Sequence, residues 1–296
     1  MVYDLVMITP LINRECINEF LNSLKINQTL KVFVLLVDMS MEDDNLNFSE
    51  FDKDFVEFVY LKQEKKHGSS VARNIALKFL FEKSNLDFKY LMYPDDDTTF
   101  DSAFFLNFEK YVAGDGVYID TRCKGTAIRY ITDKIKEGMV LRRSNDFKYI
   151  GCVSFVFSRN LIYKIGFFDE RLGAGEKYGA CEDGDYFIRS LEFANLIYKE
   201  SIYTYHPAPK VKYSKMSLKA LVKRFSSYSR GGMFLFCKHK MFYEALVMIT
   251  RGLLGSVLSL VKFQFKLSYV YFRAFLVRVE YFIILSITGI SEKTKQ

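Results

Sequence analysis

The sequence predicts an α/β protein: a mostly parallel sheet flanked by helices, followed by a helical C-terminal region. Strand-like apolar runs alternate with helix-like segments in the first half of the chain, an order typical of βαβ units. Several of these runs end in polar residues, and the composition becomes basic and then apolar after His206. The chain has 296 residues, of which 50% are hydrophobic, so it is long enough to bury a sizeable core.

Hydrophobic spacing places the individual elements in order along the chain. Strands are expected at residues 4–9, 31–37, 55–61, 86–93, 117–119, 152–157 and 203–206, and helices at 14–24, 69–81, 158–165 and from about 182 onward. Pro10 directly follows the first apolar run and is expected to stop that strand. The stretch 113–150 is the least informative, and we assign it no chemistry.

Three consecutive carboxylates, Asp95-Asp96-Asp97, follow the fourth expected strand. Open α/β sheets bind their ligands at the carboxyl ends of the strands, so the acids are expected at a binding site. Adjacent carboxylates repel each other unless a cation lies among them, and oxygen ligands suit Mg²⁺ or Mn²⁺ with a phosphate-bearing substrate. The alternative is a solvated acidic turn, because a short acidic motif is weak evidence by itself.

Other polar residues occupy equivalent places in the expected sheet. Thr9 and Asp38 follow the first two strands, so their loops can converge with the acids on one ligand. Arg73 and Asn74 fall in the first turns of the helix after Gly68, where a guanidinium and an amide can face a phosphate or a base. The alternatives are a turn acid for Asp38 and a solvated helix-face arginine for Arg73.

Taken together, these motifs resemble the inverting family-2 glycosyltransferases with the GT-A (Rossmann-like) fold. The resemblance covers about residues 3 to 206 and rests on Ile8-Thr9-Pro10 with Arg14, Val37-Asp38-Met39-Ser40, Gly68-Ser69-Ser70-Val71-Ala72-Arg73-Asn74, Asp95-Asp96-Asp97, Phe168-Asp169-Glu170-Arg171-Leu172-Gly173 and Glu182-Asp183-Gly184-Asp185. Each motif is modest, and their order and spacing make the set specific. Met39 departs from the asparagine or glycine that is more usual at this place in the family.

The resemblance implies a role for each matching residue. Thr9 and Asp38 would hold the nucleoside base, Arg73 would lie near the base and diphosphate, and Asp95 would contact the ribose. Asp97 would be the direct metal ligand, and His206 a second metal ligand. The alternative for His206 is an ordinary packed or surface histidine. The predicted substrate-binding set is completed by Pro10, Arg14, Asn74, Asp96 and Glu182. A uridine donor is expected because Asp38 can accept the imide proton of the base, but the sequence does not identify the sugar.

Transfer with inversion needs a carboxylate that takes a proton from the acceptor hydroxyl. In the family, the aspartate of a Glu-Asp pair does this, which points to Asp183. A metal at Asp97 would neutralise the charge that grows on the nucleoside diphosphate. The alternative for Glu182 and Asp183 is helix capping, since helix starts favour carboxylates. Asp185 is expected to be structural or to position the acceptor.

The region after His206 carries a block of positive charge. No Asp or Glu occurs from Ser201 to Tyr243, whereas this block contains Lys210, Lys212, Lys215, Lys219, Lys223, Arg224, Arg230, Lys238 and Lys240. Such a block indicates an anionic partner. It resembles the region that follows the catalytic domain in bacterial capsule, O-antigen and exopolysaccharide transferases, which implies a polyprenyl-diphosphate-linked acceptor and an anionic membrane surface. No nucleic-acid recognition fold accompanies the charge.

Residues 241–289 are apolar enough to span a bilayer, yet we expect them to lie along its surface. Central charges disfavour a span, and Glu244, Arg251, Lys262, Arg273 and Glu280 would form one polar stripe if a single helix ran through them. Arg278 breaks this pattern, and Gly252 and Gly255 are candidate sites for a bend or a break. The alternative is that the apolar face packs on the catalytic domain as ordinary core.

Domain boundaries and cellular location follow from these observations. We expect a catalytic domain at 1–210, with a nucleotide-sugar half at 1–113 and an acceptor half at 114–210, and a C-terminal region at 211–296. Five scattered cysteines without a Cys-x-x-Cys pair favour a reducing compartment, and the N-terminal residues show no secretory signal. The expected location is the cytoplasmic face of the inner membrane, peripherally bound.

Two other functions remain open at this point. One is a nucleotide-sugar-binding subunit of a membrane glycan-assembly complex that no longer catalyses transfer; such a relative would be expected to lose Asp97 or Asp183 first. The other is a sugar nucleotidyltransferase, which would need a glycine-rich phosphate loop after the first strand, and residues 10–14 supply none.

Overall fold

A computed structural model describes residues 2–12, 14–42, 46–83, 85–125, 128–129, 135–146, 150–207 and 216–290. The chain divides into two compact units. The first contains Met1–Phe168 and Tyr186–Ala208, and the second contains Asp169–Asp185 and Pro209–Gln296. The segment Asp169–Asp185, which we expected in the catalytic domain, therefore groups with the C-terminal helices.

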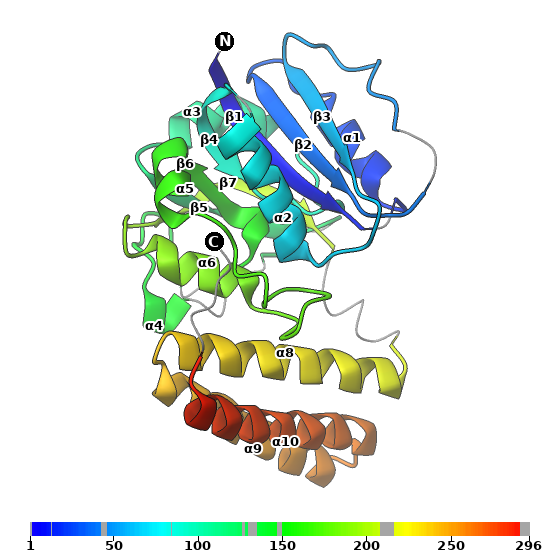
Figure 1. Ribbon diagram of the computed structural model, residues 1–296, viewed down its shortest axis with the longest axis vertical. Coiled ribbons are helices and arrows are strands. Elements are labelled where there is room, and N and C mark those ends of the chain that lie inside the picture. Colours follow the sequence, from blue (N-terminus) through cyan, green and yellow to red (C-terminus); the bar gives the residue numbers. More distant parts are fainter. Residues whose placement is uncertain are drawn as a thin grey trace. The chain divides into compact units, whose positions relative to one another are not determined.

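The first unit is built on one seven-stranded sheet (Figure 1). Its strands are β1 (Val2–Leu11), β2 (Val32–Asp38), β3 (Val56–Lys62), β4 (Asp87–Met92), β5 (Gly116–Cys123), β6 (Phe155–Ser158) and β7 (Ile197–His206), in the order β3-β2-β1-β4-β6-β5-β7. Only β6 among them pairs antiparallel, with β4 and with β5, so the other strands all run in one direction. The mostly parallel sheet is confirmed, and the carboxyl ends of β1, β2, β4 and β7 share one edge.

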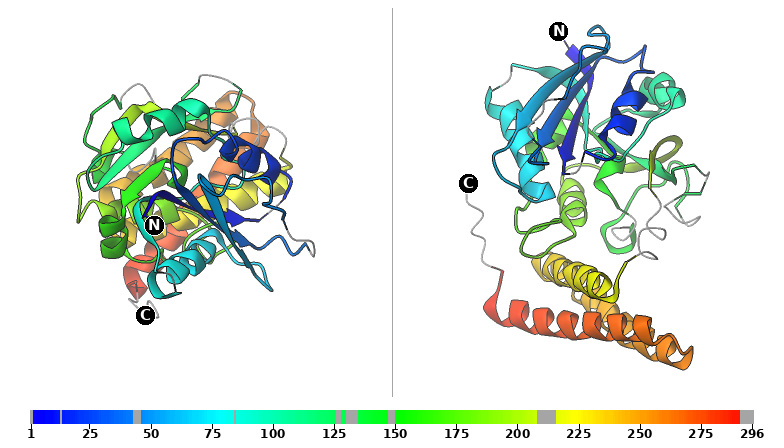
Figure 2. Two further views of the ribbon diagram at one scale, coloured as in Figure 1. Left: turned by 90° about the horizontal axis from the view of Figure 1, so that it is seen from above. Right: turned by 90° about the vertical axis from the view of Figure 1, so that its right-hand side faces the viewer.

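Helices cover both faces of this sheet, as Figures 1 and 2 show for α1 (Ile17–Leu24) and α2 (Ser69–Lys78). Alternation along β1 sends Leu5 and Met7 into a core with α1 and with α3 (Ser102–Tyr111). Val6 and Ile8 are equally buried and, by the same alternation, point to the opposite face, where α2 packs on β1 and β2. The remaining helices are α4 (Arg143–Asp146), α5 (Arg159–Ile165), α6 (Glu182–Ser190), α8 (Leu218–Lys238), α9 (Phe242–Val261) and α10 (Phe265–Thr288).

Pro10 does not stop the first strand, which was the expectation. It pairs with Val37, and β1 continues to Leu11. The carbonyl of Leu11 accepts from the N–H of Met39, which directly follows β2, at 2.8 Å. Adjacent residues of a strand direct their backbone polar groups to opposite sides, so those of Pro10 face the other neighbour, β4. The pairing with β4 has already ended at Met7, and the missing proline N–H therefore breaks no ladder bond.

Two more local differences separate the structure from the sequence prediction. The helix α3 was not predicted; Asp101 caps it by accepting from Phe104 N at 2.9 Å, and its phenylalanines are buried. The expected strand at 152–157 begins instead as a 3₁₀ turn, Cys152–Ser154, and only then becomes β6. No element was expected at residues 102–111, whereas the apolar run at 152–157 is too short to distinguish helix from strand.

The second unit contains α8, α9 and α10, and the single helix considered for residues 241–289 is wrong. A turn separates α9 from α10, with Phe263 at φ 55° and Gln264 N donating to Ser259 O at 2.8 Å. The polar stripe that required one continuous helix is therefore not formed.

The glycines of α9 do not cause this break. A Cβ on Gly252 would lie 3.2 Å from Phe275 Cα, and one on Gly255 would lie 3.2 Å from the Tyr271 ring. These glycines let α10 approach closely. Arg278, which did not fit the stripe, donates to Met248 O at 2.6 Å and to Ser229 Oγ at 3.1 Å. Arg278 thus ties α10 to both α8 and α9.

Candidate functional site

The acid loop after β4 folds back onto the end of β7. Thr99 and Tyr205 exchange two backbone hydrogen bonds, each 2.9 Å long, in an antiparallel bridge. Asp97 precedes Thr99 by two residues and His206 follows Tyr205, so an antiparallel pairing brings these two side chains together. Inside the loop, Thr98 N donates to Asp95 O at 3.0 Å, which closes a turn.

This pairing gathers a possible cation site from Asp95, Asp97 and His206. One ligand atom from each residue lies within 4.8 Å of the others. His206 Nε2 is 3.1 Å from Asp97 Oδ1 and 3.7 Å from Asp95 Oδ2, whereas Nδ1 lies 3.1 Å from Pro207 O. A proton on Nδ1 can donate to that carbonyl and leave Nε2 for a metal. Two carboxylates and an imidazole held in this way fit a divalent cation.

The cluster favours positive charge strongly. Burial by itself would lower the pKa of His206, but its hydrogen bonds and ion pairs with Asp95 and Asp97 raise it to about 10. Burial would likewise raise the pKa of Asp95, and His206 and Arg73 together lower it. A metal binds neutral imidazole, so a cation and the His206 proton compete for the same place.

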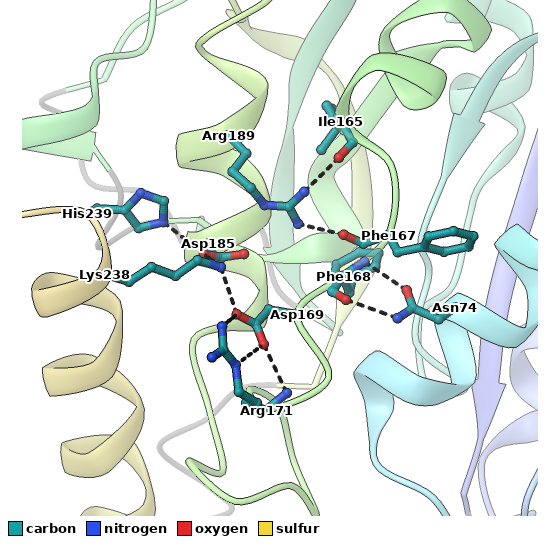
Figure 3. Close-up of polar contacts among 10 residues, drawn as sticks. All are labelled: Asn74, Ile165, Phe167, Phe168, Asp169, Arg171, Asp185, Arg189, Lys238 and His239. Atoms are coloured by element: carbon teal, nitrogen blue, oxygen red, sulfur yellow. Dashed lines mark hydrogen bonds and ion pairs between the residues drawn. The ribbon is translucent and has the colours of Figure 1, made fainter. Parts of the chain in front are cut away.

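Arg73 and Asn74 lie on α2 with different partners. The Arg73 side chain is 3% exposed, donates from Nη2 to Asp95 Oδ1 at 2.9 Å, and lies 5.5 Å from the centre of the Phe168 ring. The Asn74 amide makes two hydrogen bonds to the backbone of Phe168: Nδ2 donates to Phe168 O at 3.0 Å, and Oδ1 accepts from Phe168 N at 2.8 Å (Figure 3). Substrate contact by Asn74 stays a prediction; its observed amide contacts position Phe168.

Asp38 lies in a second polar cluster at the end of β2. Arg14 Nη2 donates to Asp38 Oδ2 at 2.6 Å and to the Tyr60 hydroxyl at 2.9 Å, and Ser40 N donates to Asp38 Oδ1 at 2.8 Å. The Tyr60 hydroxyl also donates to Asp38 Oδ2. Burial would raise the pKa of Asp38, but the hydrogen bonds from Tyr60, Ser40 and Arg14 lower it to about 2. The carboxylate is therefore ionised at neutral pH.

Tyr60 is a site residue that the sequence analysis missed. It lies on β3, and the register pairs it with Leu36, two positions before Asp38. Burial and the bond to Asp38 raise the pKa of Tyr60 to about 12, so the hydroxyl remains a donor. No local motif marks this tyrosine, because its contact with Asp38 depends on the pairing of β2 with β3.

Thr9, Pro10 and Asp96 complete the edge of the sheet. Asp96 Oδ2 accepts from Ile12 N at 3.1 Å, which ties the loop after β1 to the acid loop. Thr9 and Pro10 are buried in β1. The Thr9 hydroxyl has no hydrogen-bond partner among the residues that the structure describes. A buried hydroxyl without a partner needs an explanation, and a bound ligand or water would supply one.

Glu182 and Asp183 belong to the second unit, at the first turn of α6, and both are partly exposed. Asp183 Oδ1 accepts from Gly184 N at 2.7 Å. Asp185, in contrast, is buried and paired with Lys238 and His239. In the sequence, Lys238 was one residue of the basic block, and His239 was assigned no role. From the basic block, Lys210, Lys212 and Lys215 lie outside the described residues.

Comparisons with known proteins bear on the fold. No family model matches the chain, and no curated protein matches it in sequence. The structure is similar to the crystal structure of S. aureus TarS 1-349, with 14% identity and a TM-score of 0.55 over 97% of this chain and 92% of that one. It is also similar to TarS 1-349 in complex with UDP-GlcNAc, with 16% identity and a TM-score of 0.54 over 76% and 65% of the two chains.

The likeness to full TarS is partial. The match to that crystal structure has 16% identity and a TM-score of 0.54, and covers 75% of this chain but 39% of TarS. TarS 1-349 has also been crystallised with UDP, and that structure matches with 14% identity and a TM-score of 0.54. These comparisons show that the chain has the TarS fold: a mostly parallel seven-stranded sheet flanked by helices, with a helical C-terminal extension.

Proposed function

We propose that this protein is a glycosyltransferase that moves a sugar from a nucleotide sugar to an acceptor hydroxyl. The observation that carries the proposal is the meeting of Asp95, Asp97 and His206 at the carboxyl edge of the sheet. The TarS structures with UDP and with UDP-GlcNAc support it, because they show that this fold accommodates a nucleotide sugar in another protein. Assignment to the inverting family-2 enzymes is part of the proposal.

A divalent cation, Mg²⁺ or Mn²⁺, would be held by Asp97 and His206 with Asp95 beside them. When bound, it would neutralise negative charge on the leaving nucleoside diphosphate. Arg73 lies against Asp95 and offers a further fixed positive charge near the same place. The diphosphate would thus meet cationic groups on one side of the acid loop.

The nucleoside would lie near the second cluster. Asp38 is ionised and rigidly held by Arg14, Ser40 and Tyr60, so its carboxylate is a preorganised acceptor for the imide N–H of uracil. The unpartnered Thr9 hydroxyl, on the neighbouring strand, is a further group for the base. We therefore propose a UDP-linked donor.

Asp183 is proposed as the general base. In the transfer, the acceptor oxygen attacks the anomeric carbon, the bond from that carbon to the diphosphate oxygen breaks, and the hydroxyl proton passes to the Asp183 carboxylate. Attack opposite the leaving group inverts the configuration. Glu182 beside it is proposed to contact substrate, and the partial exposure of both side chains is compatible with these roles.

The proposed acceptor is a lipid-linked oligosaccharide on a polyprenyl diphosphate, reached from the cytoplasmic face of the inner membrane. The support is the surface of α9 and α10. Of the helices that the structure describes, α9 is the one long and apolar enough to cross a membrane, and little of it is buried. Large apolar side chains are exposed at Leu254, Leu258, Val261, Phe263 and Phe265, by 59%, 59%, 70%, 81% and 64% respectively.

Lysines accompany this apolar surface. Lys262 and Lys266 flank the exposed phenylalanines at the turn between α9 and α10, and both are exposed. Apolar groups that enter the lipid boundary beside lysines that meet anionic headgroups are typical of peripheral membrane proteins. We propose that this turn and the adjoining helix faces lie in the membrane interface.

A donor screen followed by product analysis tests the function. UDP-, GDP- and dTDP-sugars with Mn²⁺ would first be compared by thermal shift, because a ligand that binds the folded state raises the melting temperature. The donors that raise the melting temperature would then be incubated with the protein, and the reaction products would be identified. Release of UDP supports the proposal; release of pyrophosphate would indicate a nucleotidyltransferase, and binding without any turnover a non-catalytic subunit.

A further inference from the structure

A buried charge cluster joins the start of α6 to the end of α8. Lys238 Nζ lies 2.8 Å from Asp169 Oδ2 and 2.7 Å from Asp185 Oδ1, and His239 Nε2 lies 2.8 Å from the same Asp185 oxygen (Figure 3). The Asp169 and Asp185 side chains are 3% and 1% exposed. Arg171 adds two further hydrogen bonds to Asp169, at 2.8 and 2.7 Å.

Helix geometry makes this arrangement favourable. Asp185 is in the first turn of α6, where the helix dipole favours a negative charge. Lys238 is the last residue of α8 and His239 is its C-cap, where the dipole favours positive groups. Burial makes the contact specific, because removing one partner leaves the other as an uncompensated buried charge.

Close packing along α8 reinforces the same junction. Ser227 Oγ donates to Gly179 O at 3.2 Å, and the rings of Tyr178 and Phe234 stack at 4.1 Å. A Cβ on Gly231 would lie 2.5 Å from Ala180 O, so only glycine fits at that position of α8. The loop that leads into α6 is thus held along one helix before the ion pairs fix its end.

From this geometry we infer that Lys238 is a positioning residue for the general base. Asp183 lies two residues before Asp185 in the same helical turn, so the ion pair between Lys238 and Asp185 fixes the backbone that carries Asp183. The C-terminal helices therefore have a role in catalysis besides membrane binding. This inference rests on the proposed function, because it takes Asp183 as the group that must be positioned.

The test compares Lys238→Met with a matched control in the full-length protein. The control is Lys164→Met, since Lys164 is an exposed lysine in the last turn of α5. We expect kcat for UDP release to fall about 10- to 100-fold in Lys238→Met, since small displacements of a catalytic group have effects of this size. The donor KM and the affinity for UDP with Mn²⁺ should be unchanged, and Lys164→Met should match the wild type.

Two further variants keep the test decisive if Lys238→Met folds poorly. Asp185→Asn preserves the side-chain shape while it weakens both ion pairs, and should lower kcat without changing the donor KM. Lys238→Arg retains the charge and should recover part of the lost rate. The inference is overturned if Lys238→Met and Asp185→Asn both keep kcat within twofold of the wild type. A wild-type protein that binds no nucleotide sugar would instead overturn the proposed function.

Discussion

The edge of the sheet and the start of α6 both present carboxylates, but they are held in different ways. At the sheet edge, Asp38 and Asp97 follow strands of one sheet, and strand pairing brings their partners to them. At α6, Asp185 is fixed by Lys238, which comes from the end of a helix much later in the chain. The first arrangement is set by sheet topology, whereas the second depends on how helices pack.

The largest effect is expected from breaking the cation cluster at the sheet edge. Asp97→Ala removes a carboxylate that faces His206 at 3.1 Å, so Mn²⁺-dependent UDP release should fall by about 10³-fold or more. The measurement is the rate of UDP release as a function of Mn²⁺ concentration. Asp115→Asn, at an exposed acid before β5, is the control. An Asp97→Ala protein with the wild-type rate and Mn²⁺ dependence would contradict the cluster's role.

A comparable change at α6 should separate chemistry from binding. Asp183→Asn removes the proton acceptor but keeps the shape of the side chain, so turnover should fall about 10²- to 10⁴-fold. UDP affinity, measured by calorimetry with Mn²⁺ present, should stay at the wild-type value. The control is Glu192→Gln, an exposed acid shortly after α6. Wild-type turnover in Asp183→Asn would show that the base is another group.

A smaller effect is expected at the apolar surface of the second unit. Leu254→Glu with Leu258→Glu places two charges on exposed faces of α9, and binding to anionic phospholipid vesicles should weaken about 10-fold or more. Vesicle co-sedimentation measures this. Leu106→Glu changes a leucine on α3 that is 68% exposed, and this variant should bind as the wild type does. Unchanged sedimentation of the double variant would rule out this surface as the membrane contact.

The smallest effect concerns stability at acid pH. The Asp38 pKa is lowered from 3.8 to about 2, so its ionised form stabilises the fold above pH 4, and this contribution disappears as the pH falls toward 2. A shift of this size corresponds to about 2 kcal/mol. Urea unfolding at pH 5 and pH 3 should show a larger loss of stability for the wild type than for Asp38→Asn. Equal losses would mean that the carboxylate is not stabilised in the folded state.

The sequence predicts the structure best where hydrophobic spacing and the alternation of strands and helices along the chain decide the fold. The β strands of the first half and the helices α1 and α2 follow from hydrophobic spacing, and the mostly parallel sheet follows from their alternation. The resemblance implied metal-binding roles for Asp97 and His206. The pairing of Thr99 with Tyr205 explains why these side chains lie close together, and metal binding stays a prediction. The prediction that β1 ends before Pro10 was wrong, because the sequence does not show which neighbouring strand the backbone of Pro10 faces.

Contacts between distant segments were the part that the sequence did not reveal. Tyr60 meets Asp38 through strand register, and Lys238 meets Asp169 and Asp185 through helix packing. A tyrosine in a strand and a lysine in a basic block carry no sign of those partners. The position of the break between α9 and α10 was not predicted. The candidate sites were Gly252 and Gly255, whereas Lys262, Phe263 and Gln264, where the break lies, include neither glycine nor proline.

Calorimetric titration of the wild-type protein with UDP, with and without Mn²⁺, measures whether the sheet edge binds a nucleoside diphosphate together with a divalent cation. We expect UDP binding that Mn²⁺ tightens about 10-fold or more, because the cation would lie between the diphosphate and the carboxylates. Binding of equal strength with and without Mn²⁺, or no binding under either condition, would contradict it.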